Sequence, residues 1–267
     1  MTNGARYVHL SIDDTFQSLF DLAMMRGSSL ADHPTLGFLH RLHERFGACI
    51  TLYVFQEVNG RSLWELPAYL MDLFAETPWL RLAFHATSEA THAPGCRLAP
   101  DRMARAVQET HEAIARFAGP AAVDATFRLH RFAGPRAALT PDPPEGWRVV
   151  LTPDDDRAEV YDMTPRERNL LAAQTEFFDE VHRLAFLPSL RRFECDAQPE
   201  RTIEAWWSRM DEQEPQLPVA CVFTHEQHLS DPVVQDRIER AMMTATAAGA
   251  RPVFPSSLVR HERGDHA

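Results

Sequence analysis

Apolar residues follow two different rhythms along this chain. Short runs rich in β-branched and aromatic residues predict strands, and the longer segments between them, with an apolar residue every three or four positions, predict helices. The predicted strands are Tyr7–Ile12, Cys49–Phe55, Leu80–His85, Ala125–His130, Trp147–Leu151, Arg183–Leu187, Val219–Thr224 and Arg251–Phe254. The predicted helices are Thr35–Phe46, Ser62–Glu76, Pro100–Phe117, Pro199–Glu212 and Pro232–Ala248. This alternation is typical of a parallel sheet with helical crossovers, and seven or eight such units favour an α/β fold, a single, irregular (β/α) barrel.

Length and composition fit one globular domain that spans residues 1–267. Hydrophobic residues make up 45% of the chain, which excludes a disordered chain because such chains bury too little apolar surface. The formal net charge of −11 makes nucleic acid and anionic membranes poor partners. No apolar leader precedes the first predicted strand, and no run approaches the ~20 apolar residues of a membrane span, so we expect a cytoplasmic protein. The four cysteines lack metal-binding or redox spacing, and no glycine-rich phosphate loop follows a strand.

Acids and imidazoles gather where the predicted strands end. The first strand leads into Asp13 and Asp14, the third ends in His85, the fourth ends in His130, and the seventh is followed by His225. A run of three acids, Asp154, Asp155 and Asp156, follows the fifth strand. Reactive residues of (β/α) barrels lie at the carboxyl ends of strands. The sequence therefore predicts a polar site on one rim of the barrel.

Strand alternation indicates which of these side chains point inward. Arg128 and His130 share the face opposite the apolar Phe127 and Leu129, so they are expected to face the barrel interior. An arginine that faces the interior is expected to form an ion pair with a buried acid. His9 shares strand parity with the first acid of the rim and is expected to be a packed histidine of the interior.

Two of the rim residues have structural alternatives to a catalytic role. Adjacent Asp13 and Asp14 cannot point the same way on a regular strand, and Asp14 could instead cap the following helix. His85 and Glu89 are four residues apart, so on a helix they could share a divalent metal, with His92 as a further ligand. The alternative for this segment is a solvated helix start.

The ordered motifs IDDT, TLYVF, FHATSE, FRLH and VFTH resemble the polysaccharide deacetylase (NodB-homology) family over about residues 7–230. The resemblance implies that Asp13 is the general base, that Asp14 and His85 bind a metal, that Arg128 holds the base and that His225 is the general acid. One of Asp154–Asp156 would tune that acid. The chain departs from the family pattern at four places, with Thr15 for glycine, Glu89 for the second metal-binding histidine, Leu129 and His130 for the proline pair, and Arg157 for tryptophan. Glu89 or His130 would then be the third metal ligand.

The resemblance implies a metal-dependent hydrolase that removes an acyl group, N-acetyl first of all, from a carbohydrate or a related small amide. The cofactor would be a divalent metal, Zn²⁺ by preference, with Mn²⁺, Ni²⁺ or Co²⁺ as alternatives. The expected partner is a small-molecule or carbohydrate substrate. The alternative is a non-catalytic carbohydrate-binding barrel with a degenerate metal site, and metal content separates the two. An amidohydrolase is disfavoured because His9-Leu10-Ser11 stands where the HxH motif would lie.

Overall fold

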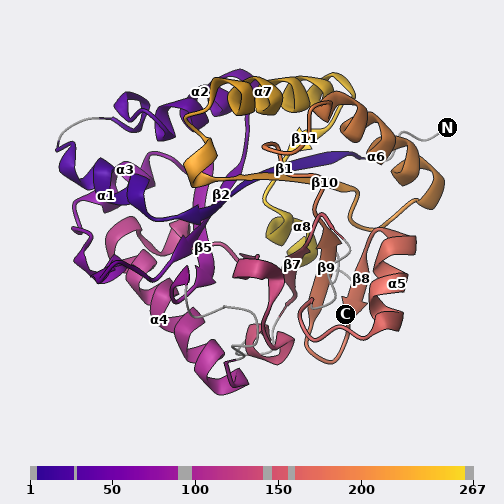
Figure 1. The fold of residues 1–267 in the computed structure, drawn as a ribbon, viewed down its shortest axis with the longest axis horizontal. Helices are drawn as coiled ribbons and strands as arrows, with labels where there is room; N and C mark the ends of the chain where they lie inside the picture. Colours follow the sequence, from indigo (N-terminus) through magenta and orange to yellow (C-terminus); the bar gives the residue numbers. More distant parts are fainter. Residues whose placement is uncertain (1–4, 27–28, 90–97, 141–145, 156–159, 262–267) are drawn as a thin grey trace.

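The strands form two mainly parallel sheets in the computed structural model, which describes residues 5–26, 29–89, 98–140, 146–155 and 160–261 (Figure 1). The first sheet has the order β10-β1-β2-β5, with bounds Val219–His225, Tyr7–Thr15, Ile50–Phe55 and Leu80–Ala86. Short β11 (Arg251–Pro252) also pairs with β1. The second sheet has the order β6-β7-β9-β8, with bounds Thr126–Phe127, Arg148–Thr152, Leu184–Pro188 and Phe177–Asp179, and β8 pairs with β9 antiparallel. A separate antiparallel hairpin consists of β3 (Glu57–Val58) and β4 (Arg61–Ser62).

Single parallel bridges link the two sheets at both junctions. Leu82 bridges to Val123, next to β6, and Ser189, next to β9, bridges to Cys221 of β10. Within the described ranges, the strands β10-β1-β2-β5-β6-β7-β9 therefore follow one another as an irregular ring. The predicted α/β fold with a parallel central sheet is confirmed, in a form split into two sheets rather than a continuously bonded barrel.

Helices surround the strands (Figure 1), with α2, α6 and α7 along one side and α4 next to β5. Their bounds are α1 Gln17–Met24, α2 Leu36–Phe46, α3 Leu70–Ala75, α4 Pro100–Ala118, α5 Pro165–Gln174, α6 Pro199–Gln213, α7 Pro232–Ala247 and α8 Pro255–His261. The predicted helix over 62–76 is in fact a 3-10 turn, Leu63–Glu65, followed by α3. In the part of the chain that the structure describes, no helix is both long and apolar enough to span a bilayer.

The two faces of β1 differ in chemistry. Val8, Leu10 and Ile12 belong to the large hydrophobic cluster that the surrounding helices complete. His9 and Ser11 alternate with them and are fully buried on the other face. The ring interior is thus partly polar, and its polar side chains lead toward the rim where β1 ends.

Two histidines outside the rim are buried. His9 is buried as expected, and its Nδ1 lies 3.0 Å from the carbonyl oxygen of Val253. His33 is also buried: its side chain lies under the α2 start, where its Nδ1 accepts hydrogen bonds from the N–H groups of Thr35 and Leu36.

Candidate metal centre

A break in the β1 ladder brings two adjacent aspartates to one rim. The pairing of β1 with β2 shifts register between Ile12 and Thr15, and Asp14 has a φ of 58°. Such a φ is uncommon for a non-glycine residue, and residues held in it cluster at functional sites. The bulge lets Asp13 and Asp14 both reach residues on the neighbouring strand ends, which a regular strand would prevent.

The capping role considered for Asp14 belongs to another acid. Helix α1 has Phe16 at its N-cap position, and no side chain of its own caps it. Instead, the Glu226 carboxylate accepts hydrogen bonds from the backbone N–H groups of Phe16, Gln17 and Ser18. Asp14 is therefore left available to the rim.

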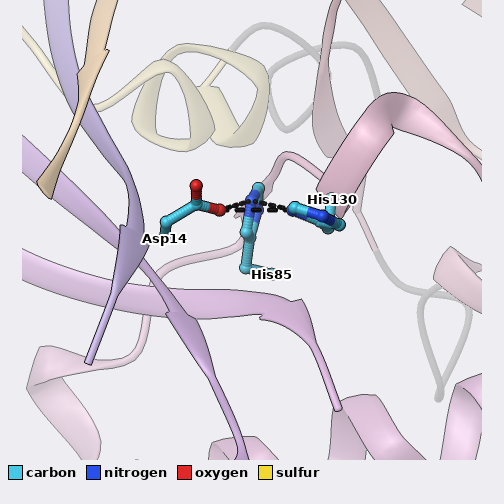
Figure 2. Close-up of side chains that lie close together, drawn as sticks. All are labelled: Asp14, His85 and His130. Carbon is cyan, nitrogen blue, oxygen red and sulfur yellow. Dashed lines mark hydrogen bonds and ion pairs between the residues drawn. The ribbon is translucent and has the colours of Figure 1, made fainter. Parts of the chain in front are cut away.

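Three side chains from separate elements form a near-equilateral triangle of ligand atoms (Figure 2). Asp14 Oδ1 lies 3.2 Å from His85 Nε2 and 3.2 Å from His130 Nδ1, and the two histidine nitrogens are 3.3 Å apart. Ligand atoms of a tetrahedral site with ~2.0 Å bonds lie ~3.3 Å from one another. One carboxylate oxygen and two imidazole nitrogens at this spacing fit one face of a tetrahedral divalent metal site.

The partners of these ligands support that interpretation. His85 Nδ1 lies 2.6 Å from the carbonyl oxygen of Arg128, to which it would donate, so its Nε2 lone pair faces the triangle. Metal-binding histidines are usually held by such a hydrogen bond. Burial opposes ionisation of Asp14, but the imidazoles of His130 and His85 beside its carboxylate outweigh this and hold the pKa of Asp14 well below its ordinary value. The Asp14 carboxylate is thus kept ionised, as a metal ligand must be.

Glu89 does not join this triangle. Its side chain is exposed, and the ligand cluster found among the described residues consists of Asp14, His85 and His130. Of the two residues proposed for the third ligand position, His130 is the one that the structure brings to the other two. His92 lies outside the described residues.

Asp13 pairs with the buried arginine that the strand pattern predicts. Arg128 is fully buried, and its Nη1 donates to Asp13 Oδ1 at 2.9 Å and to Ser11 Oγ at 3.0 Å. Its Nη2 donates to Ser189 Oγ at 2.8 Å. Burial lowers the pKa of Arg128, but the charge of Asp13 outweighs this and raises it above its ordinary value. A permanent positive charge therefore lies against the Asp13 carboxylate.

His225 is paired with an acid that sequence reasoning missed. Its Nδ1 lies 2.5 Å from Glu194 Oε1, and Thr224 Oγ1 donates to Glu194 Oε2 at 2.9 Å. Burial lowers the pKa of His225, but the hydrogen bond and charge of Glu194, together with the charges of Asp13 and Asp14, raise it above the usual value. Glu194 lies between β9 and α6 without a recognisable motif, so no sequence signal identifies it.

The acidic run expected to tune His225 has a different partner. Asp154 accepts hydrogen bonds from Nε and Nη2 of Arg192 at 3.0 and 2.8 Å, and Asp155 lies 3.4 Å from the same guanidinium. Asp156 lies outside the described residues. The prediction that this run supplies the partner of His225 is wrong for the two acids that the structure describes. Arg192 binds both of them, and Glu194 is the acid that contacts the His225 imidazole.

The two proton-transfer candidates are neighbours in the sheet. Asp13 of β1 and His225 of β10 are register partners in a parallel ladder, so their side chains project from adjacent strands at the same end. Asp14 is the next residue of β1 after Asp13. A carboxylate held by an arginine, an imidazole held by a carboxylate and a three-ligand triangle therefore share one rim.

Comparisons with known proteins bear on the fold. No protein-family model and no curated protein matches the sequence. The structure is similar to a protein from Pseudomonas aeruginosa PAO1 described as a probable polysaccharide deacetylase, with a TM-score of 0.54, 11% identity, and coverage of 98% of this chain and 91% of that one.

A protein from Mycobacterium smegmatis, described as a putative polysaccharide deacetylase, gives a TM-score of 0.53 at 12% identity over 98% of this chain and 92% of that one. The chain has the fold of the polysaccharide deacetylases. PuuE allantoinase shares it too, with a TM-score of 0.52, 11% identity, and coverage of 98% and 91%. The fold expected from the family resemblance is confirmed, and activity has to be argued from the site.

Proposed function

We propose that this protein is a metal-dependent hydrolase that removes an acyl group, N-acetyl first of all, from a carbohydrate or a related small amide. The observation that carries the proposal is the ligand triangle of Asp14, His85 and His130. It lies on the rim that also holds the Asp13–Arg128 and His225–Glu194 pairs.

The triangle would hold a divalent metal, Zn²⁺ by preference. Three protein ligands are the number typical of catalytic sites, where a further position is left open. A bound metal of this kind supplies Lewis acidity and makes water a stronger acid near neutral pH.

The remaining residues would move protons. The Asp13 carboxylate would accept the proton of the attacking water, and the ion pair with Arg128 holds that carboxylate in place. His225 would donate a proton to the nitrogen of the departing amine. The raised pKa of His225 supports this role, because it favours the protonated ring near neutral pH.

The non-catalytic carbohydrate-binding barrel has less support. It was suggested by Glu89 standing in place of a metal-binding histidine, and His130 compensates for that replacement by supplying a third ligand atom. The structural neighbours include proteins named as polysaccharide deacetylases and an allantoinase. Substrate trials should therefore cover N-acetylated sugars and small non-sugar amides.

The test is hydrolysis by metal-replete protein, measured as release of acetate or of a free amine. Asp13→Asn should lower the rate by a factor of about 10² to 10⁴, the usual contribution of a general base, while the metal content stays unchanged. Glu44→Gln alters an exposed carboxylate on α2 and is the matched control, expected to act like wild type. Equal rates for Asp13→Asn and wild type would remove Asp13 from the mechanism, and no hydrolysis of any substrate by wild type would favour the binding barrel.

A further inference from the structure

His130 is carried by a segment whose backbone is strained. Strand β6 ends at Phe127, so His130 is not held by a sheet ladder. Arg131 and Phe132, which follow it, both have a φ of 56°. Non-glycine residues rarely adopt this conformation in succession, and they keep it only where the surroundings impose it.

Tyr161 contacts this segment on both sides of His130. Its hydroxyl accepts the N–H of Leu129 at 3.1 Å and donates to the carbonyl oxygen of Leu151, in β7, at 2.8 Å. Its own backbone N–H donates to the carbonyl oxygen of Phe132 at 3.0 Å. The side chain is fully buried, and its ring meets the Phe132 ring edge-on. The hydroxyl thereby connects the residue before His130 to a strand of the barrel.

We propose that Tyr161 is a positioning residue that holds His130 as the third metal ligand. The inference rests on the proposed metal centre and deepens it. Asp14 and His85 come from strands, whereas His130 depends on hydrogen bonds made by a residue about thirty positions away in the chain. Without the hydroxyl, the Leu129 N–H loses its acceptor and the strained segment loses its connection to β7. His130 Nδ1 would then sample positions away from the triangle, and metal affinity would fall.

The test is the affinity of the whole chain for Zn²⁺, measured by competition with a chelating dye. Tyr161→Phe removes only the hydroxyl, and we expect affinity to fall roughly 10- to 100-fold, the usual loss when the support of a metal ligand is removed. Tyr53→Phe is the matched control. Tyr53 is also fully buried, its ring lies 6.1 Å from the His85 ring, and its hydroxyl has no hydrogen-bond partner among the described residues. The Zn²⁺ affinity of Tyr53→Phe should equal that of wild type.

A double-mutant cycle separates positioning from a general effect on stability. In a His130→Ala background, Tyr161→Phe should cause no further loss of Zn²⁺ affinity, because the ligand that it positions is gone. An equal further loss in that background would overturn the proposal, as would wild-type affinity in Tyr161→Phe alone. Wild type that binds no Zn²⁺ would overturn the proposed metal centre as well, so the two failures are distinguishable.

Hydrogen exchange of wild type tests the same contact without any variant. The Leu129 amide should exchange slowly, because its N–H is buried against the Tyr161 hydroxyl. Exchange at the rate of an unfolded peptide would show that the hydroxyl does not hold the segment, and would overturn the proposal even if Tyr161→Phe did not fold.

Discussion

Loss of the Arg128 charge should destabilise the protein more than almost any other single substitution. Arg128 is 0% exposed and Asp13 is 3% exposed, so solvent does not screen their 2.9 Å ion pair. The guanidinium also donates to Ser11 and Ser189 and lies 4.0 Å from the centre of the Phe223 ring. Arg128→Met keeps much of the apolar volume but leaves the carboxylate and both hydroxyls without their donor.

The expected loss is about 3–5 kcal/mol in the free energy of unfolding, the range for a buried ion pair that loses one partner. Asp13→Asn in the same chain should recover part of it, because the unpaired charge is then gone. The double variant should therefore be more stable than the sum of the two single losses predicts, by about 2 kcal/mol.

The assay is urea unfolding followed by circular dichroism, in the presence of a chelator so that metal binding does not add to stability. A loss below about 1 kcal/mol for Arg128→Met would contradict the reasoning, since removing a buried charge partner costs more. Strict additivity of the two substitutions would contradict it as well, because it would show that the Arg128–Asp13 contact carries no coupling energy.

Three further predictions follow from contacts and pKa shifts. In the proposed mechanism His225 must be protonated, and Glu194 helps to raise its pKa, so activity should fall as pH rises through the pKa of His225. Glu194→Gln should move this alkaline limb of the kcat/KM profile to lower pH, whereas Asp154→Asn, whose acid binds Arg192, should leave it in place. Glu226→Ala should lower the free energy of unfolding by about 1–2 kcal/mol, because it removes the α1 cap, without changing metal affinity in a dye competition. Burial and the nearby Arg148 lower the pKa of His111 from 6.5 to about 4, so the free energy of unfolding should decrease as pH falls from 6.5 toward 4. In urea titrations at several pH values, His111→Phe should reduce this decrease by at most roughly 3 kcal/mol.

Much of the fold could be predicted, because the spacing of apolar residues along a short segment indicates both the type of element and its buried face. The apolar run at the first strand and the helical spacing over 100–117 correspond closely to β1 and α4. Helix α5 was not predicted, because its apolar positions define no clear face, although the Thr164 capping box and Pro165 mark its start. The fourth strand was predicted too long, since its ladder ends at Phe127 and the chain then turns through Arg131.

The candidate site was predicted as a set of strand ends, and its details depend on contacts between distant residues. Spacing alone suggested Glu89 as a partner of His85, but the strained turn that presents His130 contains no glycine or asparagine to reveal it. The acid that binds His225 could not be chosen from sequence either. Asp154 is bound by Arg192, which leaves Glu194 as the partner, and neither fact is visible before the chain is folded.

The most direct test of the account is metal content by mass spectrometry on purified, metal-replete protein and three alanine variants. We predict about one divalent metal per chain in wild type and in Glu89→Ala, and a much lower metal content in His85→Ala and His130→Ala, which each keep two of the three ligands. Wild type without metal would contradict the proposed centre. So would a loss of metal in Glu89→Ala together with full metal content in His130→Ala.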